Sequence, residues 1–235
     1  MEQANVLETA TVGAATSTTE MKPRYTKGEE IFNMVTHIVG GAVGVTALVL
    51  CVVFAALHGN VYGVVGGSLY GASMVVLYTM SSVYHGLSPK LGAKKVFRVL
   101  DHCTIFFLIA GTYTPIALCS IREYNTALGW TIFGIIWGMA ALGITLTAID
   151  LKKYAKFSMV CYLGMGWCII FTAPILPKML EKGALVFLIL GGVAYTIGAI
   201  LYGIGKKKKY IHSIFHLFVV AGSILHFFCI LFYVI

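Results

Sequence analysis

Between residues 61 and 84 the chain reads VYGVVGGSLYGASMVVLYTMSSVY, a run that contains no Asp, Glu, Lys or Arg. A helix needs about 20 mostly apolar residues to cross a hydrocarbon core roughly 30 Å thick. The run does not alternate between apolar and polar residues, as the strands of a membrane barrel do. It therefore predicts a membrane-spanning helix.

The whole chain repeats this pattern. Seven apolar runs follow one another with short linkers, at 31–57, 61–84, 99–120, 127–149, 157–176, 183–205 and 210–235. Hydrophobic residues make up 59% of the chain and charged residues 11%, whereas soluble domains carry about 25% charged residues. We predict an all-α integral membrane protein, with one seven-helix bundle over residues 25–235. Pro115 and Pro174 predict kinks in the third and fifth spans.

The first 24 residues differ from the rest. They are rich in Ala, Thr, Ser and Glu and contain almost no large apolar side chains. Such a segment cannot bury enough surface to offset the entropy lost on ordering, so residues 1–24 are expected to form a disordered tail. The first apolar run begins near Ile31 and is too long for a cleaved signal peptide.

The basic residues predict the orientation in the membrane, since cytoplasmic loops carry an excess of Lys and Arg. Three lie on the C-terminal side: Arg122, Lys178 and Lys182. Fourteen lie on the side of the N-terminal tail: Lys22, Arg24, Lys27, Lys90, Lys94, Lys95, Arg98, Lys152, Lys153, Lys156, Lys206, Lys207, Lys208 and Lys209. We expect a cytoplasmic N-terminus and an external C-terminus. The net charge of +8 then indicates contact with anionic headgroups and not with nucleic acid.

Ionisable groups are costly in membrane helices and usually have a function. Most of those in this chain fall at the predicted cytoplasmic ends of the runs: His37, His85, Asp101, His102, His212 and His216. His58 lies at the opposite side. His226 lies deeper in the last run, where a buried histidine that packs between helices is the simpler interpretation.

These polar residues are spaced as a metal site requires. His212 and His216 are four residues apart, which puts both rings on one helix face, and Ser81 and His85 have the same spacing. Three histidines with one open position form a catalytic zinc site, and a carboxylate such as Asp101 could orient the bound water. A lone interfacial histidine is more often solvated, which is the simpler interpretation of His58 and His102.

A second polar face lies on the first run. Glu30, Asn33 and His37 are three and four residues apart on one helix face. They could hydrogen-bond to the metal ligands without binding the metal themselves. Alternatively, Glu29 and Glu30 are acidic residues of the kind that stabilise a helix N-terminus. Asn33 and His37 lie deeper, where that explanation does not apply.

Five motifs, in this order, resemble the hemolysin III family, the bacterial branch of the progestin and adipoQ receptor superfamily, which includes the adiponectin receptors. They are EEIFNMVTH (29–37), SSVYH (81–85), LDH (100–102), AGTYTP (110–115) and HSIFH (212–216). The resemblance implies seven helices with a cytoplasmic N-terminus, and zinc bound by His85, His212 and His216. It also implies that Asp101 lies near the zinc-bound water and that Ser81 belongs to the site.

The resemblance also implies an activity. Adiponectin receptors are similar to ceramide hydrolases, so a zinc-dependent hydrolase of lipid amides or esters in the bacterial cell membrane is the first expectation, with membrane lipids as partners. A protein that regulates the state of the membrane lipids is a related expectation. The alternatives are a membrane-damaging cytolysin and a non-catalytic sensor in which zinc is structural. A secreted pore former should be soluble before insertion. A chain with 59% hydrophobic residues does not favour a soluble form.

Overall fold

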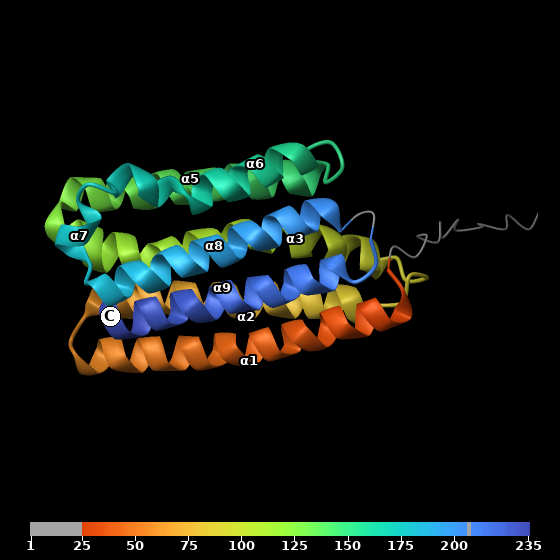
Figure 1. Ribbon diagram of the computed structural model, residues 1–235, viewed down its shortest axis with the longest axis horizontal. Helices are drawn as coiled ribbons and strands as arrows, with labels where there is room; N and C mark the ends of the chain where they lie inside the picture. Colours follow the sequence, from red (N-terminus) through yellow and green to blue (C-terminus); the bar gives the residue numbers. More distant parts are fainter. Residues whose placement is uncertain (1–24, 206–207) are drawn as a thin grey trace, which may run out of the picture.

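The computed structural model describes residues 25–205 and 208–235, and in these residues seven helical segments are long and apolar enough to cross a membrane. The predicted tail, residues 1–24, lies outside the described residues. Figure 1 shows the helices side by side as one elongated bundle. Five spans are continuous: α1 (Lys27–Leu57), α2 (Val61–Gly86), α5 (Thr126–Ile149), α8 (Lys182–Ile204) and α9 (Ile211–Tyr233). The predicted seven-helix membrane fold is confirmed.

The other two spans are composite. The third consists of α3 (Ala93–Pro115), a π-helical segment (Ile116–Ile121) and α4 (Arg122–Tyr124), and the π-helix follows Pro115 directly. Proline lacks an N–H group and disturbs the helical hydrogen bonds around it. The fifth span is α6 (Ala155–Gly166) followed by a 3₁₀ helix (Cys168–Thr172). Pro174 therefore lies beyond the fifth span, in the turn before the short helix α7 (Leu176–Met179), and does not kink the span itself.

Close helix packing depends on small residues. α1 packs along α2, and α9 packs against both α1 and α8. A Cβ atom added to Gly71 of α2 would lie 2.4 Å from the Cα atom of Leu48 in α1, so only glycine allows this approach. Gly134 and Gly138 of α5 are four residues apart, a spacing common where helices pack closely, but no heavy atom of a neighbouring helix in the described part of the chain lies within 4 Å of a Cβ added to either. Their spacing therefore does not mark a helix contact.

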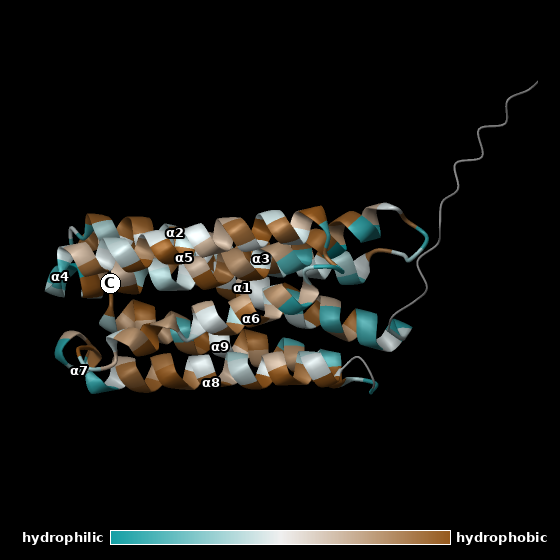
Figure 2. Ribbon diagram, turned by 90° about the horizontal axis from the view of Figure 1, so that it is seen from above, coloured by the Kyte–Doolittle hydropathy of each residue, from teal (hydrophilic) through white to brown (hydrophobic). Residues whose placement is uncertain are grey.

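The outer surface of the bundle is apolar. Figure 2 shows hydrophobic ribbon along most of its length, with hydrophilic segments gathered at the ends. Large side chains such as Val35, Val39 and Val49 of α1 are about half exposed. An apolar surface of this extent is stable in a bilayer and would aggregate in water.

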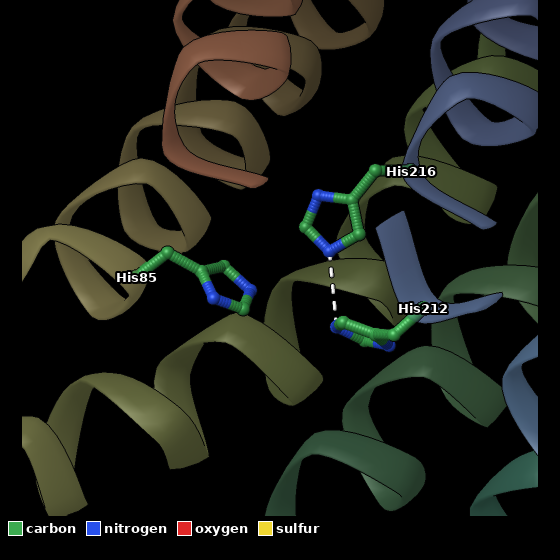
Figure 3. A group of neighbouring side chains, drawn as sticks. All are labelled: His85, His212 and His216. Atoms are coloured by element: carbon green, nitrogen blue, oxygen red, sulfur yellow. Dashed lines mark hydrogen bonds between the residues drawn. The ribbon is translucent and has the colours of Figure 1, made fainter. Parts of the chain in front are cut away.

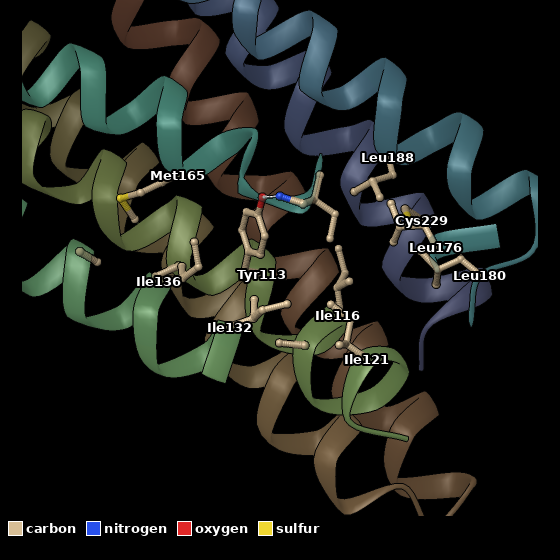
Figure 4. Close-up of a cluster of buried hydrophobic side chains, with 14 of the residues drawn as sticks. Tyr113, Ile116, Ile121, Ile132, Ile136, Met165, Leu176, Leu180, Leu188 and Cys229 are labelled. Carbon is tan, nitrogen blue, oxygen red and sulfur yellow. Dashed lines mark hydrogen bonds between the residues drawn. The ribbon is translucent and has the colours of Figure 1, made fainter. Parts of the chain in front are cut away.

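The largest apolar cluster surrounds the second half of the third span (Figure 4). Tyr113 lies in this cluster, and its hydroxyl donates to the Gly166 carbonyl at 2.9 Å and accepts from the Ile169 N–H at 2.9 Å. These bonds satisfy main-chain groups where α6 gives way to the 3₁₀ helix. The more polar residues lie toward the opposite end of α3, where the candidate site is found.

Candidate metal centre and its cavity

Three buried histidines meet where α2 ends and α9 begins. Each of His85, His212 and His216 offers one ring nitrogen, and these three atoms lie within 4.8 Å of one another. Figure 3 shows the three rings turned toward a common space, one from α2 and two from α9. The arrangement could hold a metal ion.

The two histidines of α9 already approach each other closely. Their Nε2 atoms are 3.1 Å apart, a hydrogen-bond distance. The four-residue spacing puts both side chains on one face of the helix, as the sequence predicts. Two neutral imidazoles can satisfy this contact only if one of them carries a hydrogen on Nε2. A cation shared by the two lone pairs would satisfy both rings equally well.

His85 is held by a carboxylate from another helix. Its Nδ1 atom lies 2.6 Å from Oε2 of Glu30 in α1, so Nδ1 carries the hydrogen and donates it. Its Nε2 atom is buried, and no hydrogen-bond partner for it occurs within residues 25–205 and 208–235. A histidine that donates one ring N–H to a carboxylate and presents its other nitrogen is the usual form of a metal ligand.

Lys94 completes this arrangement from α3. Its ammonium donates to Oε1 of Glu30 at 2.9 Å and to the Leu87 carbonyl at 2.8 Å. Lys94 is only 3% exposed, so its charge needs a partner of opposite sign. The Glu30 carboxylate thus links three helices and fixes the orientation of His85.

The two glutamates in the first turn of α1 have separate roles. Glu29 forms a capping box with Thr26, and its Oε1 accepts the Tyr210 N–H at 2.7 Å. Glu30 instead binds His85 and Lys94. Glu29 therefore acts as a helix cap, whereas Glu30 holds a candidate metal ligand in place.

Aromatic rings enclose the histidines. Tyr25 stacks on His212 with ring centres 4.6 Å apart and covers the group from the N-terminal end of the bundle. His37 stacks on His216, with centres 3.8 Å apart. Asn33 is fully buried one turn before His37, and its main chain lies beside His216. Both candidates for a supporting role, Asn33 and His37, therefore lie against or next to a histidine of the group.

Several polar atoms around the histidines lack a protein partner. In the part of the chain that the structure describes, this holds for the side-chain polar atoms of Asn33 and His37 and for the Ser81 hydroxyl. Buried polar groups are almost always hydrogen-bonded, so such a concentration is typical of a place where water or an ion binds. Together with the free Nε2 of His85, this shows that the residues present suit a metal ion with coordinated water.

The histidine group opens into a cavity of about 150 Å³ inside the bundle. At this end the cavity is lined by His212, His216, Ser81, Asp101 and His37, and from there it extends among mostly apolar side chains of α3, α6, α8 and α9. The structure therefore brings Asp101 and Ser81 to the same cavity as two of the predicted ligands. Asp101 lies 3.6 Å from Nδ1 of His102.

The remaining histidines are placed differently. His102 also lines the cavity, but its Nδ1 contacts the Arg98 carbonyl at 2.8 Å and its Nε2 contacts the Tyr202 hydroxyl at 3.1 Å. Both nitrogens are therefore engaged by the protein. His58 lies at the other end of the bundle, against the Phe54 carbonyl. Sequence reasoning missed Tyr25 and Lys94, because an isolated tyrosine and one lysine among many loop lysines give no signal.

The chain matches known proteins over nearly all of its described length. The family model for Haemolysin-III related proteins matches residues 25–227. Hemolysin-3 of Bacillus cereus is 40% identical over 208 residues, covering 88% of this chain and 92% of that protein. The Hemolysin-3 homolog of Bacillus subtilis is 38% identical over 209 residues, covering 89% and 96%. The human Monocyte to macrophage differentiation factor is 28% identical over 170 residues, covering 69% and 67%. The chain is therefore a multi-pass membrane protein of the hemolysin III family.

Proposed function

We propose that this protein is a zinc-dependent hydrolase of lipid amides or esters in the bacterial cell membrane. One observation carries the proposal: a group of three buried histidines lies at one end of a mostly apolar cavity inside a membrane-spanning bundle. Histidines that only packed the helices together would need neither a free ligand atom nor a cavity. An apolar cavity suits a lipid chain better than a water-soluble substrate.

The ligand set supports zinc. Three neutral imidazoles with an open position are typical of catalytic zinc sites, whereas Mg²⁺ and Ca²⁺ prefer oxygen ligands. When bound, zinc would lower the pKa of a coordinated water to about 7 and polarise a scissile carbonyl. Glu30 would hold His85 in the tautomer that ligation needs, because its carboxylate accepts the Nδ1 hydrogen.

Asp101 and Ser81 would act on the substrate directly. As a water oxygen bonds to the carbonyl carbon, the Asp101 carboxylate would take the proton that the water loses. Protonated Asp101 would then return it to the leaving nitrogen or oxygen as the bond to the carbonyl carbon breaks. The Ser81 hydroxyl, which lines the same cavity, would donate a hydrogen bond to the oxygen that gains negative charge.

The place of the cavity within the bundle supports a membrane lipid as substrate. Its lining residues belong to segments that cross the membrane, so an acyl chain could remain in an apolar environment while its amide or ester group reaches the histidines. The relatives in Bacillus cereus and Bacillus subtilis support a bacterial cell membrane as the location.

The experiment measures zinc content and lipid turnover on the same preparation. The wild-type protein and Asp101→Ala are purified in detergent, and each is offered ceramide-like and phospholipid substrates. We expect release of fatty acid by the wild type, and a loss of about 100-fold or more in Asp101→Ala with zinc retained. Zinc binding without turnover of any of these lipids would contradict the hydrolase.

A structural role for zinc is the second candidate. The ligands come from α2 and α9, so a bound ion would tie two segments that are far apart in the sequence. In that case His212→Ala should lower the thermal unfolding temperature strongly, and wild-type protein with bound zinc should show no turnover. A hydrolase would lose activity in His212→Ala even under conditions where the variant remains folded.

A membrane-damaging role is the third candidate, and only the names of the two Bacillus relatives favour it. The lipid-facing surface of the bundle gives little support to a form that is soluble before insertion. A cytolysin should release dye from liposomes when purified protein is added from outside. Without such leakage, the hydrolase accounts better for the histidine group and its cavity.

A further inference from the structure

Another buried histidine, His226, lines the cavity far from the group formed by His85, His212 and His216. His226 lines the cavity ten residues beyond His216 on α9, which corresponds to about 15 Å along the helix axis. This distance is about half the thickness of a hydrocarbon core of roughly 30 Å. His226 therefore lies deep in the membrane, beside the middle of a long acyl chain whose amide or ester group reaches the three histidines.

The other polar side chains at this depth have partners within the protein. Tyr113 bonds to the Gly166 carbonyl and the Ile169 N–H, as described above. The indole N–H of Trp167 donates to the Thr196 hydroxyl at 2.9 Å, which in turn donates to the Gly192 carbonyl at 2.7 Å. The Thr112 hydroxyl donates to the Leu108 carbonyl at 2.8 Å. These groups therefore need no ligand to satisfy their hydrogen bonds.

His226 is different. Its Nδ1 atom lies 2.8 Å from the Gly222 carbonyl, and because a carbonyl only accepts hydrogen bonds, Nδ1 carries the hydrogen. A charged ring without a counter-ion would be costly in this apolar interior, so the ring is neutral and its Nε2 atom presents a lone pair. Across the described ranges, 25–205 and 208–235, no hydrogen-bond partner is found for Nε2.

The packing around the ring holds it in place. His226 stacks on Tyr195 with ring centres 5.3 Å apart and planes 14° from parallel, and the Tyr195 hydroxyl is fixed by Ser223 at 2.8 Å. A Cβ atom added to Gly191 would lie 2.4 Å from Cε1 of His226. A Cβ atom added to Gly222 would lie 2.7 Å from the Tyr195 ring. Both glycines thus make room for the stacked pair.

We propose that Nε2 of His226 accepts a hydrogen bond from a hydroxyl group on the lipid chain that fills the cavity. The proposal rests on the proposed function in one respect, namely that a lipid chain occupies this cavity. A hydroxyl suits the site because one acceptor calls for one donor, while a charged group would be too costly at this depth. A plain chain would leave the acceptor desolvated and unpaired, so the site selects hydroxylated acyl chains.

An ordered water is a weaker occupant. A buried water usually needs two to four polar partners, whereas the tyrosine, tryptophan and threonine hydrogens at this depth are already donated to the protein. A hydroxyl attached to an acyl chain needs only one partner, because the rest of the chain fills the apolar part of the cavity.

The test measures binding and does not depend on turnover. Zinc-loaded protein in detergent is titrated with stearate and with a stearate that carries one mid-chain hydroxyl, each competing against a fluorescent fatty acid. For the wild type we expect the hydroxylated chain to bind about three- to tenfold more tightly, the range of one added hydrogen bond. In His226→Phe, which keeps a ring against Tyr195 but lacks the acceptor, the preference should disappear.

Tyr195→Phe is the matched control, because it removes a hydroxyl next to His226 while the ring stack remains. It should keep the preference. If His226→Phe is not recovered as folded protein, Gly191→Ala displaces the His226 ring by its added methyl group and should also reduce the preference. Equal binding of both stearates by the wild type would indicate a water-filled site and overturn the proposal. A preference that survives in His226→Phe would overturn it as well.

The same titration separates this proposal from the hydrolase. Asp101→Ala should keep the preference for the hydroxylated chain whatever its overall affinity for stearate, since Asp101 lies at the other end of the cavity from His226. A protein that prefers the hydroxylated chain but cleaves no lipid would contradict only the proposed activity.

Discussion

Replacing Glu30 by Gln tests how His85 is oriented. The substitution keeps the size of the side chain but removes the negative charge that accepts the Nδ1 hydrogen of His85 at 2.6 Å. A hydrogen bond to a charged group contributes about 1.5–3 kcal/mol and a neutral one about 1 kcal/mol. Carboxylates that support a metal-binding histidine typically contribute 10- to 100-fold in metal affinity. We therefore expect Glu30→Gln to bind zinc about tenfold or more weakly than the wild type.

The same substitution leaves Lys94 without its carboxylate, which would lower stability independently of the metal. Adding Lys94→Met removes this unpaired charge. The double variant should regain thermal stability relative to Glu30→Gln but keep the weakened zinc affinity. Glu29→Gln is the matched control, because Glu29 is a neighbouring buried carboxylate that contacts Thr26 and the Tyr210 N–H. It should lose about 1 kcal/mol of stability as a weakened helix cap and keep its zinc affinity within about threefold.

The assay is competition for zinc against a chelating dye in detergent, combined with thermal unfolding of the metal-free proteins. The reasoning would be refuted if Glu30→Gln bound zinc as tightly as the wild type. It would also be refuted if Glu29→Gln lost as much zinc affinity as Glu30→Gln. The loss would then follow from removing any carboxylate at the start of α1, and not from the contact between Glu30 and His85.

Three further predictions concern other parts of the chain. Ser81→Ala should lower kcat for lipid hydrolysis by about 10²–10³ with zinc content unchanged, and an unaltered kcat would exclude the hydroxyl from the reaction. Gly71→Leu should cost about 1–3 kcal/mol in helix packing, whereas Gly134→Leu should leave the unfolding temperature nearly unchanged, because only the first meets a facing helix. A membrane-impermeant maleimide added to intact cells should label Lys178→Cys and spare Lys90→Cys, and the reverse pattern would overturn the predicted orientation.

The seven spans could be predicted because a bilayer imposes one simple requirement on sequence. Each span must carry about 20 apolar residues, and in this chain short polar linkers separate such runs clearly. The prediction was less accurate where an α-helix changes to a 3₁₀ helix. The run 157–176 was expected to be one span through Pro174, but the span ends at Thr172 after a 3₁₀ segment.

The candidate site was partly predictable, because a spacing of four residues determines that two side chains share a helix face. His212 and His216 follow from that rule, and His85 follows from its place at the same end of the bundle. The contact between Glu30 and His85 does not follow, since it joins residues 55 positions apart and depends on how α1 packs against α2. The sequence left Glu30 with two interpretations, and only the helix packing distinguishes them.

His226 shows a further limit. From the sequence it reads as a buried histidine between helices, and it is indeed buried. Its contact with the cavity depends on the space left by Gly191 of α8, which no local pattern in α9 reveals. A cavity is a property of several packed helices and cannot be derived from one of them.

The central claim is that His85, His212 and His216 form a zinc site, and elemental analysis tests it most directly. Wild-type protein, purified in detergent without added metal, is analysed for zinc per chain beside His212→Ala and His102→Ala. The three-histidine site predicts about one zinc per chain in the wild type and in His102→Ala, and almost none in His212→Ala. Wild-type protein that binds no zinc even after zinc is supplied, or His212→Ala that retains it fully, would contradict the claim.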